Sequence, residues 1–288
     1  MRTRLLKLFG VVFGAAALIA PASSWGSATI GANLAALTPN IAGYNCGAGH
    51  PCTVANTELL PSFTAANGLS SPVKGTVTSF QVRTGPVTGP LQLRVLRPAG
   101  IFHTGAGTAA PVSPPMNQIS PSYPVSLPIR PGDVIGLNCC QSGANAVQTA
   151  ALPSGNNYAA WGINTSPALG DGETREPDSG SHTAALIVSA QVEPDNSFTL
   201  GKVKAKLGRI KLEATVPNPG VLSAGTRLLK SSRFTVNTAG TVGLVGKPTR
   251  TGRARLSKTG KLKIVVTYTP TFGAAAIQKI KAKVKPKR

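Results

Sequence analysis

The stretch KVKAKLGRIKLEATV, residues 202–216, alternates apolar residues with mostly cationic ones at a period of two. This period is typical of a β-strand with one face in a core and the other in water, because successive side chains of a strand point to opposite sides. Gly208 separates two such runs, as the turn of a hairpin does. We therefore predict two paired strands with an apolar inner face. The residues expected in the core are Val203, Ala205, Leu207, Ile210, Leu212, Ala214 and Val216.

The same alternation of lysines with apolar residues returns at 261–264 and at 279–285. About seven short strands are expected after residue 196, the number typical of a small immunoglobulin-like sandwich. The outer faces of these strands are then rows of cations. The cations predicted to lie on an anionic-surface binding face are Lys202, Lys204, Lys206, Lys211, Lys261, Lys263, Lys279, Lys281, Lys283 and Lys285.

The net charge of +21 is concentrated at one end of the chain. From Asn196 onward there are 21 lysines and arginines and a single acid, Glu213, whereas residues 29–195 hold six bases and eight acids. The charge changes sign within the polar, proline-bearing stretch 193–197. This asymmetry predicts two domains with different partners, at residues 29–195 and 196–288.

The first residues of the chain are typical of a signal peptide. Arg2, Arg4 and Lys7 precede an apolar run at 8–20 that is short for a membrane span, and small residues follow it. We predict a signal peptide at residues 1–28, with cleavage after Ala22 or Ala28, of which the second is favoured. An uncleaved anchor is the alternative, and no later stretch is long and apolar enough for a transmembrane helix.

The predicted first domain is rich in glycine and proline and contains several short alternating runs. Leu91, Leu93 and Val95 are expected to face inward, a change of phase at Val77 predicts a bulge or a strand buried on both faces, and Pro128 predicts an edge strand. No amphipathic helix of three turns is predicted anywhere. The fold class expected is all-β, with a jelly-roll-like sandwich followed by the smaller immunoglobulin-like basic sandwich. Further strands are expected at 53–59, 75–83, 134–137, 158–163 and 184–192, and a turn at 130–133.

All four cysteines, Cys46, Cys52, Cys139 and Cys140, belong to the predicted first domain. Export would allow disulfides, and four cysteines permit three pairings. A local bond between Cys46 and Cys52 is favoured, which leaves Cys139 and Cys140 as a vicinal bond or as thiols. Two long-range bridges are the alternative. A metal site is not expected, because the sequence has no Cys-x-x-Cys pair and no histidine at ligand spacing.

Several of these segments resemble a group of uncharacterised secreted proteins from soil actinobacteria. The segments are 75–80, 91–98, the Gly-Asp-x-x-Gly-Leu element within 128–137, and 190–195. The part of the chain after Phe198 resembles the lysine-rich β-domain that is appended to such proteins. The resemblance implies export and a β-architecture, and it implies no activity and no site residues.

Few residues suggest chemistry. The histidines His50, His103 and His182 are isolated and are interpreted as loop residues, and no nucleophile elbow of the form Gly-x-Ser-x-Gly is present. Residues 243–249 have the wrong glycine spacing for a phosphate loop. Four acids at 171–178 form either a calcium loop or, as we favour, a solvated loop, and Asp133 is expected to be a turn residue rather than a ligand.

Carbohydrate-binding β-sandwiches commonly use exposed aromatic rings, and Tyr158 and Trp161 are the best stacking candidates, with a core role as the alternative for Trp161. No cofactor is predicted. The function expected is a secreted, non-enzymatic envelope protein whose basic domain binds anionic wall polymers or polysaccharide. A solubilising surface, a secreted hydrolase and a filament subunit are the alternatives, and specific nucleic-acid recognition is not expected, because the basic strands lack interleaved aromatics.

Overall fold

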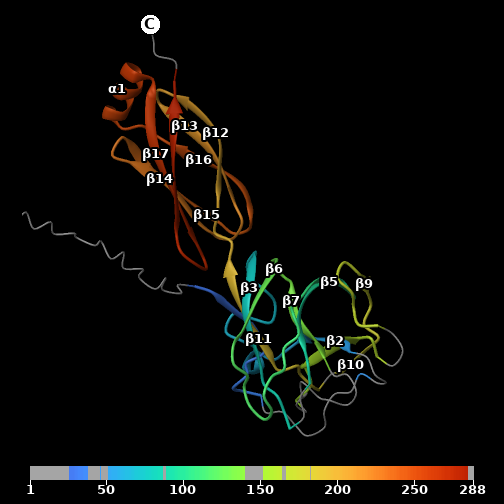
Figure 1. Cartoon of the computed structure of the whole chain (residues 1–288). Helices are drawn as coiled ribbons and strands as arrows, with labels where there is room; N and C mark the ends of the chain where they lie inside the picture. The colour runs from blue at the N-terminus through green and yellow to red at the C-terminus, as the bar shows by residue number, and fades with distance from the viewer. Residues whose placement is uncertain are drawn as a thin grey trace, which may run out of the picture.

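The computed structural model describes residues 26–37, 46, 51–86, 89–139, 152–163, 167–181 and 183–284. Figure 1 shows two bodies joined end to end, which we name the N-terminal body (residues 26–194) and the C-terminal body (residues 198–284). Within the described residues the fold is all-β apart from one 3-10 turn, η1 (Pro61–Phe63), and one helix, α1 (Arg250–Thr259). No described helix is long and apolar enough to cross a membrane.

The N-terminal body consists of two packed antiparallel sheets. The four-stranded sheet has the order β1-β11-β3-β6, and the seven-stranded sheet has the order β10-β8-β2-β7-β4-β5-β9. The strands of the first sheet are β1 (Ala28–Gly31), β3 (Gly75–Val82), β6 (Tyr123–Ile129) and β11 (Val188–Pro194). Those of the second are β2 (Cys52–Glu58), β4 (Gln92–Ala99), β5 (Phe102–Thr108), β7 (Val134–Cys139), β8 (Asn157–Trp161), β9 (Thr174–Arg175) and β10 (Ser179–Ser181).

The core between these sheets follows the predicted alternation. Leu91, Leu93 and Val95 are at most 1% exposed, and they belong to one cluster together with residues of β2, β3, β7 and β11. The pairing of β3 with β6 shifts register after Val77, which confirms the bulge, and β6 with its Pro128 lies at a sheet edge as predicted. Strand β5 was not predicted, because its glycines, threonines and His103 show no apolar alternation.

The C-terminal body is a second pair of antiparallel sheets, with the orders β12-β13-β16 and β15-β14-β17-β18. Seven strands are present, as the sequence predicts. They are β12 (Thr199–Lys206), β13 (Arg209–Val216), β14 (Gly220–Thr226), β15 (Leu229–Val236), β16 (Gly240–Gly246), β17 (Lys261–Pro270) and β18 (Ala276–Lys283).

The hairpin of β12 and β13 forms as the alternating stretch predicts, with Lys206 opposite Arg209 across the turn at Gly208. The inward residues of β13 are at most 2% exposed, whereas Val203, Ala205 and Leu207 are half-buried. The difference arises because β12 is the edge strand of its sheet, whereas β13 is covered by neighbours on both sides.

The helix α1 corrects the expectation that the chain has no helix of about this length. Thr249 caps its first turn by accepting a hydrogen bond from the backbone N–H of Gly252, and Gly260 ends it in the left-handed conformation at φ 64°. Only Gly252 and Leu256 are buried in it. A helix that buries only two residues has no long apolar stripe, so its sequence shows no helical periodicity. The residues that indicate this helix are its capping residues.

The two bodies meet at Asn218, which follows β13 and is 1% exposed. Its side-chain amide donates to the carbonyl oxygens of Lys74 and Asp195 and accepts from the backbone N–H of Lys74, at 2.7 to 3.0 Å. Asn196 donates to the carbonyl of Phe272, whose ring packs against the N-terminal core. The short connection between β11 and β12 is therefore held from both sides.

Candidate functional site

The outer face of β17 and β18 carries lysines in directly opposed pairs. Lys261 lies opposite Lys283, and Lys263 lies opposite Lys281, and all four side chains are exposed. Like charges that face each other across two strands destabilise a sheet, by roughly 0.2–1 kcal/mol per pair. An anion that lies along this face would relieve that repulsion.

Next to these pairs lies a hollow with a volume of about 730 Å³. Its cations come from four elements: Arg227 from the turn between β14 and β15, Arg255 from α1, Lys261 and Lys263 from β17, and Lys281 from β18. The apolar parts of Leu228, Leu262 and Val265 line it further. We name this hollow, lined by Thr226, Arg227, Leu228, Thr251, Arg255, Lys261, Leu262, Lys263, Val265 and Lys281, the basic groove.

Helix α1 forms one wall of the basic groove because it is tied to the neighbouring turn. The backbone N–H of Thr249 donates to the carbonyl of Leu228 at 3.0 Å, and a side chain at Gly252 would overlap that same carbonyl. Leu256 anchors the helix in the core at 0% exposure. Arg255 is therefore held on a fixed wall, although its side chain is free to move in solvent.

The cations of the C-terminal body are not neutralised by the protein. Every ion pair of the described residues joins two residues within the range 74–195. The C-terminal body has a single acid, Glu213, which lies on the other sheet. Unpaired charges of one sign that gather on a surface produce a potential that attracts polyanions.

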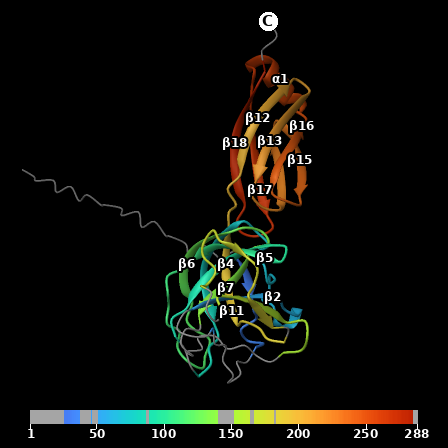
Figure 2. The same ribbon diagram turned by 90° about the vertical axis from the view of Figure 1, so that its right-hand side faces the viewer.

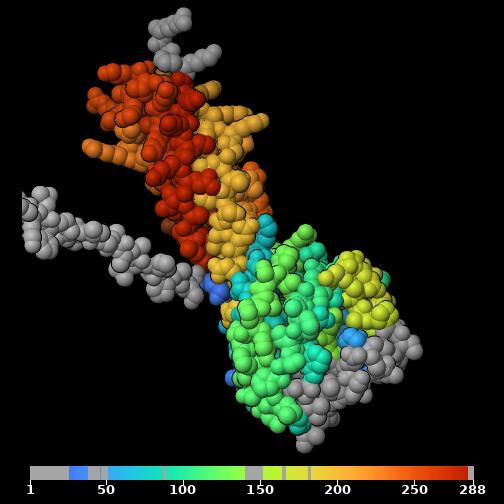
Figure 3. All heavy atoms as spheres, in the orientation of Figure 1, coloured from blue at the N-terminus to red at the C-terminus, as the bar shows by residue number. Residues whose placement is uncertain are grey.

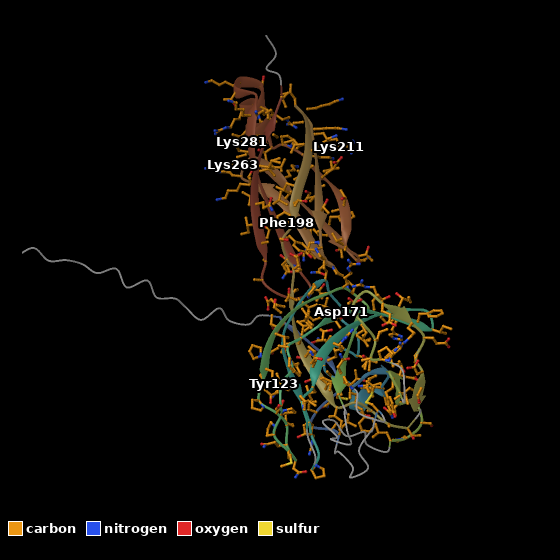
Figure 4. All side chains as sticks on the ribbon, turned by 45° about the vertical axis from the view of Figure 1, so that its right-hand side comes forward. Tyr123, Asp171, Phe198, Lys211, Lys263 and Lys281 are labelled. Atoms are coloured by element: carbon orange, nitrogen blue, oxygen red, sulfur yellow. A yellow bond between two sulfur atoms is a disulfide. The ribbon has the colours of Figure 1, made fainter. Side chains whose placement is uncertain are left out.

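Lys279 lies on β18 beside these pairs, and the predicted lysines of β12 and β13, which are Lys202, Lys204, Lys206 and Lys211, lie on the other sheet. Lys204 is opposite Lys211, and both line a smaller hollow of about 290 Å³ together with Lys202, Arg209 and Glu213. Figure 4 shows Lys211 on one side of the C-terminal body and Lys263 and Lys281 on the other. The sequence does not predict this division, because a period of two gives the face of a strand but not the sheet to which the strand belongs.

The two sets of lysines are connected around one edge of the body. β12 and β18 are edge strands of different sheets, and Figures 2 and 3 show them side by side. The side chain of Gln278 donates to the carbonyl of Phe198 where the two strands begin. The cations thus form a belt across β13, β12, β18 and β17. Lys285, which was also predicted to belong to this face, lies outside the described residues.

Tyr158 and Trp161 do not form a sugar-stacking pair, which corrects that expectation. Both belong to β8, but positions three apart in a strand point to opposite sides. Tyr158 packs against the core between the sheets, where burial raises the pKa of its hydroxyl. Trp161 is 0% exposed in a cluster on the outer face of the same sheet, and its indole N–H donates to the carbonyl of Arg175 at 3.2 Å. It has the core role that was the alternative.

His103 is a strand residue rather than the loop residue expected. It lies on β5 with 7% exposure, and its ring centroid is 5.0 Å from that of Trp161 in an edge-on arrangement. Burial lowers the pKa of its imidazole. It lines a hollow of about 510 Å³ on the outer face of the seven-stranded sheet. His50 and His182 lie outside the described residues.

The acidic stretch at 171–178 is not merely a solvated loop, because several of its acids bind cationic side chains or the backbone of the N-terminal body. Asp171 pairs with the buried Arg94 at 2.9 Å, Glu173 pairs with Arg175, and Asp178 accepts from the backbone N–H of Gly162. Burial lowers the pKa of Arg94, and Asp171 and Glu173 oppose that effect. Within the described part of the chain no three acidic, histidine or cysteine side chains converge as a metal site would require.

Asp133 is the turn residue predicted, and it has a second role. It accepts from the backbone N–H of Arg130 across the turn, and it binds the guanidinium of Arg97 through both oxygens at 3.0 Å. Cys46 and Cys52 form the local disulfide, as favoured from the sequence. Cys139 is disulfide-bonded too, and Cys140 lies outside the described residues.

The chain matches no protein-family model, and no curated protein is significantly similar to it in sequence.

Proposed function

We propose that this protein is an exported, non-enzymatic envelope protein whose C-terminal body binds an anionic wall polymer. The observation that carries the proposal is the basic groove, which gathers cations from four elements and has no acid among its described lining residues. Lysine supplies a strongly hydrated point charge and arginine a planar fork that fits phosphate or carboxylate groups. A linear polyanion is favoured over a small anion because the cations continue along strands instead of converging on one point.

The belt extends the groove in two directions. Along a strand, residues on one face repeat every 6.6–6.8 Å or so, and opposed residues on neighbouring strands are about 5 Å apart. Lys279, Lys281 and Lys283 therefore present three charges in line, beside Lys261 and Lys263. A chain with an anionic group in each repeating unit meets several of these cations at once, so its affinity is the sum of weak, screened contacts.

We also propose a more specific fold for each of the two bodies. A jelly-roll-like N-terminal body is supported by its strand order, because β1-β11-β3-β6 and β2-β7-β4-β5 form eight strands in two sets of four. An immunoglobulin-like C-terminal body is supported by seven antiparallel strands divided between sheets of three and four. Both bodies suit the group of secreted actinobacterial proteins that the sequence resembles.

Export is supported by the disulfide between Cys46 and Cys52, because such bonds persist outside the cytoplasm. The packing of β1 favours cleavage after Ala22 rather than after Ala28. Ala28 is the first residue of β1 and pairs with Val192, and the hydroxyl of Ser27 donates to Gln191. N-terminal sequencing of the secreted protein is expected to begin at Ser23, and a start at Thr29 would contradict this assignment.

The binding experiment uses the full mature chain with sodium polyphosphate and polygalacturonate, which separate phosphate from carboxylate recognition. The groove variant is Lys263→Glu with Lys281→Glu. The control, Lys230→Glu with Lys247→Glu, has the same net charge and changes two exposed lysines outside both hollows. Titrations are made in low and in high salt.

We expect the groove variant to bind at least one of the two polymers about tenfold more weakly than the control, with a shallower dependence on salt, because fewer counterions are released. Equal weakening in both variants would mean that only net charge matters, and the absence of salt-sensitive binding would refute the proposal. A single-stranded oligonucleotide of equal charge tests the nucleic-acid alternative. Release of short polymer fragments would favour the hydrolase alternative instead.

A further inference from the structure

The hollow beside His103 is a feature of the N-terminal body that polyanion binding does not use. Its volume is about 510 Å³, within the range typical of small-molecule sites. It lies over β2, β4, β5, β7, β8 and β10, at the opposite face of the seven-stranded sheet from the main core. The stretch at Glu176 and Pro177 borders it.

His103 is a buried polar residue in the wall of this hollow. The residue is 7% exposed and lines the hollow, whereas its Nδ1 atom is buried and has no hydrogen-bond partner among the described residues. Burial lowers the pKa of the imidazole, and none of the ion pairs among the described residues involves His103, so the neutral ring is favoured. A neutral imidazole has one hydrogen-bond donor and one acceptor, and leaving either unpaired in a buried site is unfavourable.

The other walls combine hydroxyl groups with apolar surface. Thr57 and Ser179 provide hydroxyls and Glu176 an exposed carboxylate, whereas the amide of Asn56 is already bonded to the backbone of Leu186. The apolar lining residues are Pro98, Ile101, Val134, Ala159 and Pro177. Ile101 is 64% exposed at the turn between β4 and β5, so its side chain is accessible to a ligand in the hollow.

The ligand that fits these walls is uncharged. The described lining residues include no cation that would attract an anion, in contrast to the basic groove, and the one acid among them, Glu176, lies at the rim. It calls for a molecule with several hydroxyl groups that both donate and accept hydrogen bonds, and with an apolar C–H face that packs on proline and isoleucine. A pyranose ring has both properties.

We propose that this hollow binds a neutral saccharide, with His103 hydrogen-bonded to a sugar hydroxyl and Ile101 and Pro98 against the ring. The site is independent of the polyanion proposal, because it lies in the other body and shares no residue with the basic groove. Trp161, which is in contact with His103, reports on it.

The test uses the mature chain, in which Trp161 and the N-terminal Trp25 are the only tryptophans. Trp25 is replaced by phenylalanine, so that fluorescence reports on Trp161 alone. The probes are glucose, galactose, mannose and N-acetylglucosamine, together with their β-1,4-linked disaccharides where these exist. Binding is followed by Trp161 fluorescence and by the nuclear magnetic resonance signals of the His103 ring.

The variants are chosen so that loss of folding does not imitate loss of binding. Ile101→Ser changes an exposed lining residue, and Phe102→Ser changes its neighbour, which is 42% exposed and does not line the hollow. His103→Gln keeps a donor and an acceptor without the ring. We expect one class of sugar to shift the His103 signals in wild type and in Phe102→Ser, with at least fivefold weaker binding in Ile101→Ser and in His103→Gln.

Three results would overturn the proposal. No shift of the His103 signals with any of the sugars at 20 mM, about a hundredfold above a typical protein concentration in such a titration, would mean that the hollow holds water only. Equal affinity in Ile101→Ser and Phe102→Ser would place the sugar elsewhere. Preferential binding of an anionic sugar such as glucuronate would exclude the neutral ligand class.

Discussion

The two bodies of this protein have the same architecture of packed antiparallel sheets, but they treat charge in opposite ways. In the N-terminal body acidic side chains form ion pairs with basic ones, for example Asp171 with Arg94 and Asp133 with Arg97. In the C-terminal body lysines face lysines across neighbouring strands. A β-sandwich core thus tolerates either surface, because the inner and outer faces of a strand are separate.

The interiors differ as well. Of the buried polar residues that the structure describes, all but Asn218 belong to the N-terminal body, and they include Arg94, His103 and Asp133. Such groups need specific partners, so they fix loops and shape hollows. The C-terminal core is almost purely apolar, and its specificity lies on its surface. This difference is consistent with the two proposals above, in which the N-terminal body recognises a shaped ligand and the C-terminal body attracts a charged polymer.

The largest expected change in stability comes from a substitution that destabilises the N-terminal body alone. Trp161→Ala removes a fully buried indole and its hydrogen bond to the carbonyl of Arg175. The cost is about 3–5 kcal/mol of unfolding free energy. Urea denaturation is expected to shift the transition of the N-terminal body while leaving that of the C-terminal body in place. A common shift of both transitions would show that the two bodies unfold as one unit.

Alkaline pH is expected to act on the C-terminal body. Burial, partly opposed by a hydrogen bond to the carbonyl of Asn218, raises the pKa of Tyr268 to about 12 from 10.0. The folded state therefore favours the protonated phenol. Its stabilisation, at most about 3 kcal/mol, is complete below pH 10 and is lost as pH rises towards 12. Thermal melting between pH 9 and 12 measures the loss, and Tyr268→Phe, which cannot ionise, is expected to show a smaller slope.

The junction offers a way to uncouple the bodies. Asn218→Ala removes three hydrogen bonds and leaves backbone groups of Lys74 and Asp195 without their partner. We expect a loss of about 1–3 kcal/mol, and faster cleavage by protease within the connection 195–198. Asn196→Ala, which removes one bond to Phe272, is the milder control. Unchanged proteolysis in both variants would show that the connection is protected by other contacts.

The smallest expected change in stability tests the repulsion between opposed lysines in the C-terminal body. Lys281→Glu places an acid opposite Lys263, so that a repulsive pair becomes attractive. The C-terminal body is expected to gain about 0.2–1 kcal/mol in low salt, and the gain is expected to fade as salt screens it. Lys230→Glu, outside the groove, gives the effect of net charge alone. If both variants gain equally, local pairing contributes nothing.

Much of the fold followed from the sequence, and the reasons are local. Alternation predicted the hairpin of β12 and β13, the inward residues of β4 and the bulge at Val77, because each depends on neighbours in the chain. The helix α1 was missed although Thr249 and Gly260 are typical capping residues. Asn218 was missed as well, and its position between two prolines, Pro217 and Pro219, is a weak signal that the backbone there is fixed.

The candidate sites were predicted less completely. The sequence identified the lysines and the sign of their partner, but not the basic groove, whose Arg227 and Arg255 come from a turn and a helix. It placed Tyr158 and Trp161 together, although the period of the strand separates them. It described His103 as a loop residue, because the strand around it has no apolar pattern.

The sequence by itself determined the all-β class, the two charge regimes and the inner face of each alternating strand, since all three are properties of composition or of a period of two. Only the tertiary structure decided which strands became neighbours. That pairing placed the lysines of β12 and β13 on one sheet and those of β17 and β18 on the other, buried Trp161 beneath His103, and brought Asn218 to Lys74 from 144 residues away. Contacts of this length depend on how whole sheets pack, and no local period encodes them.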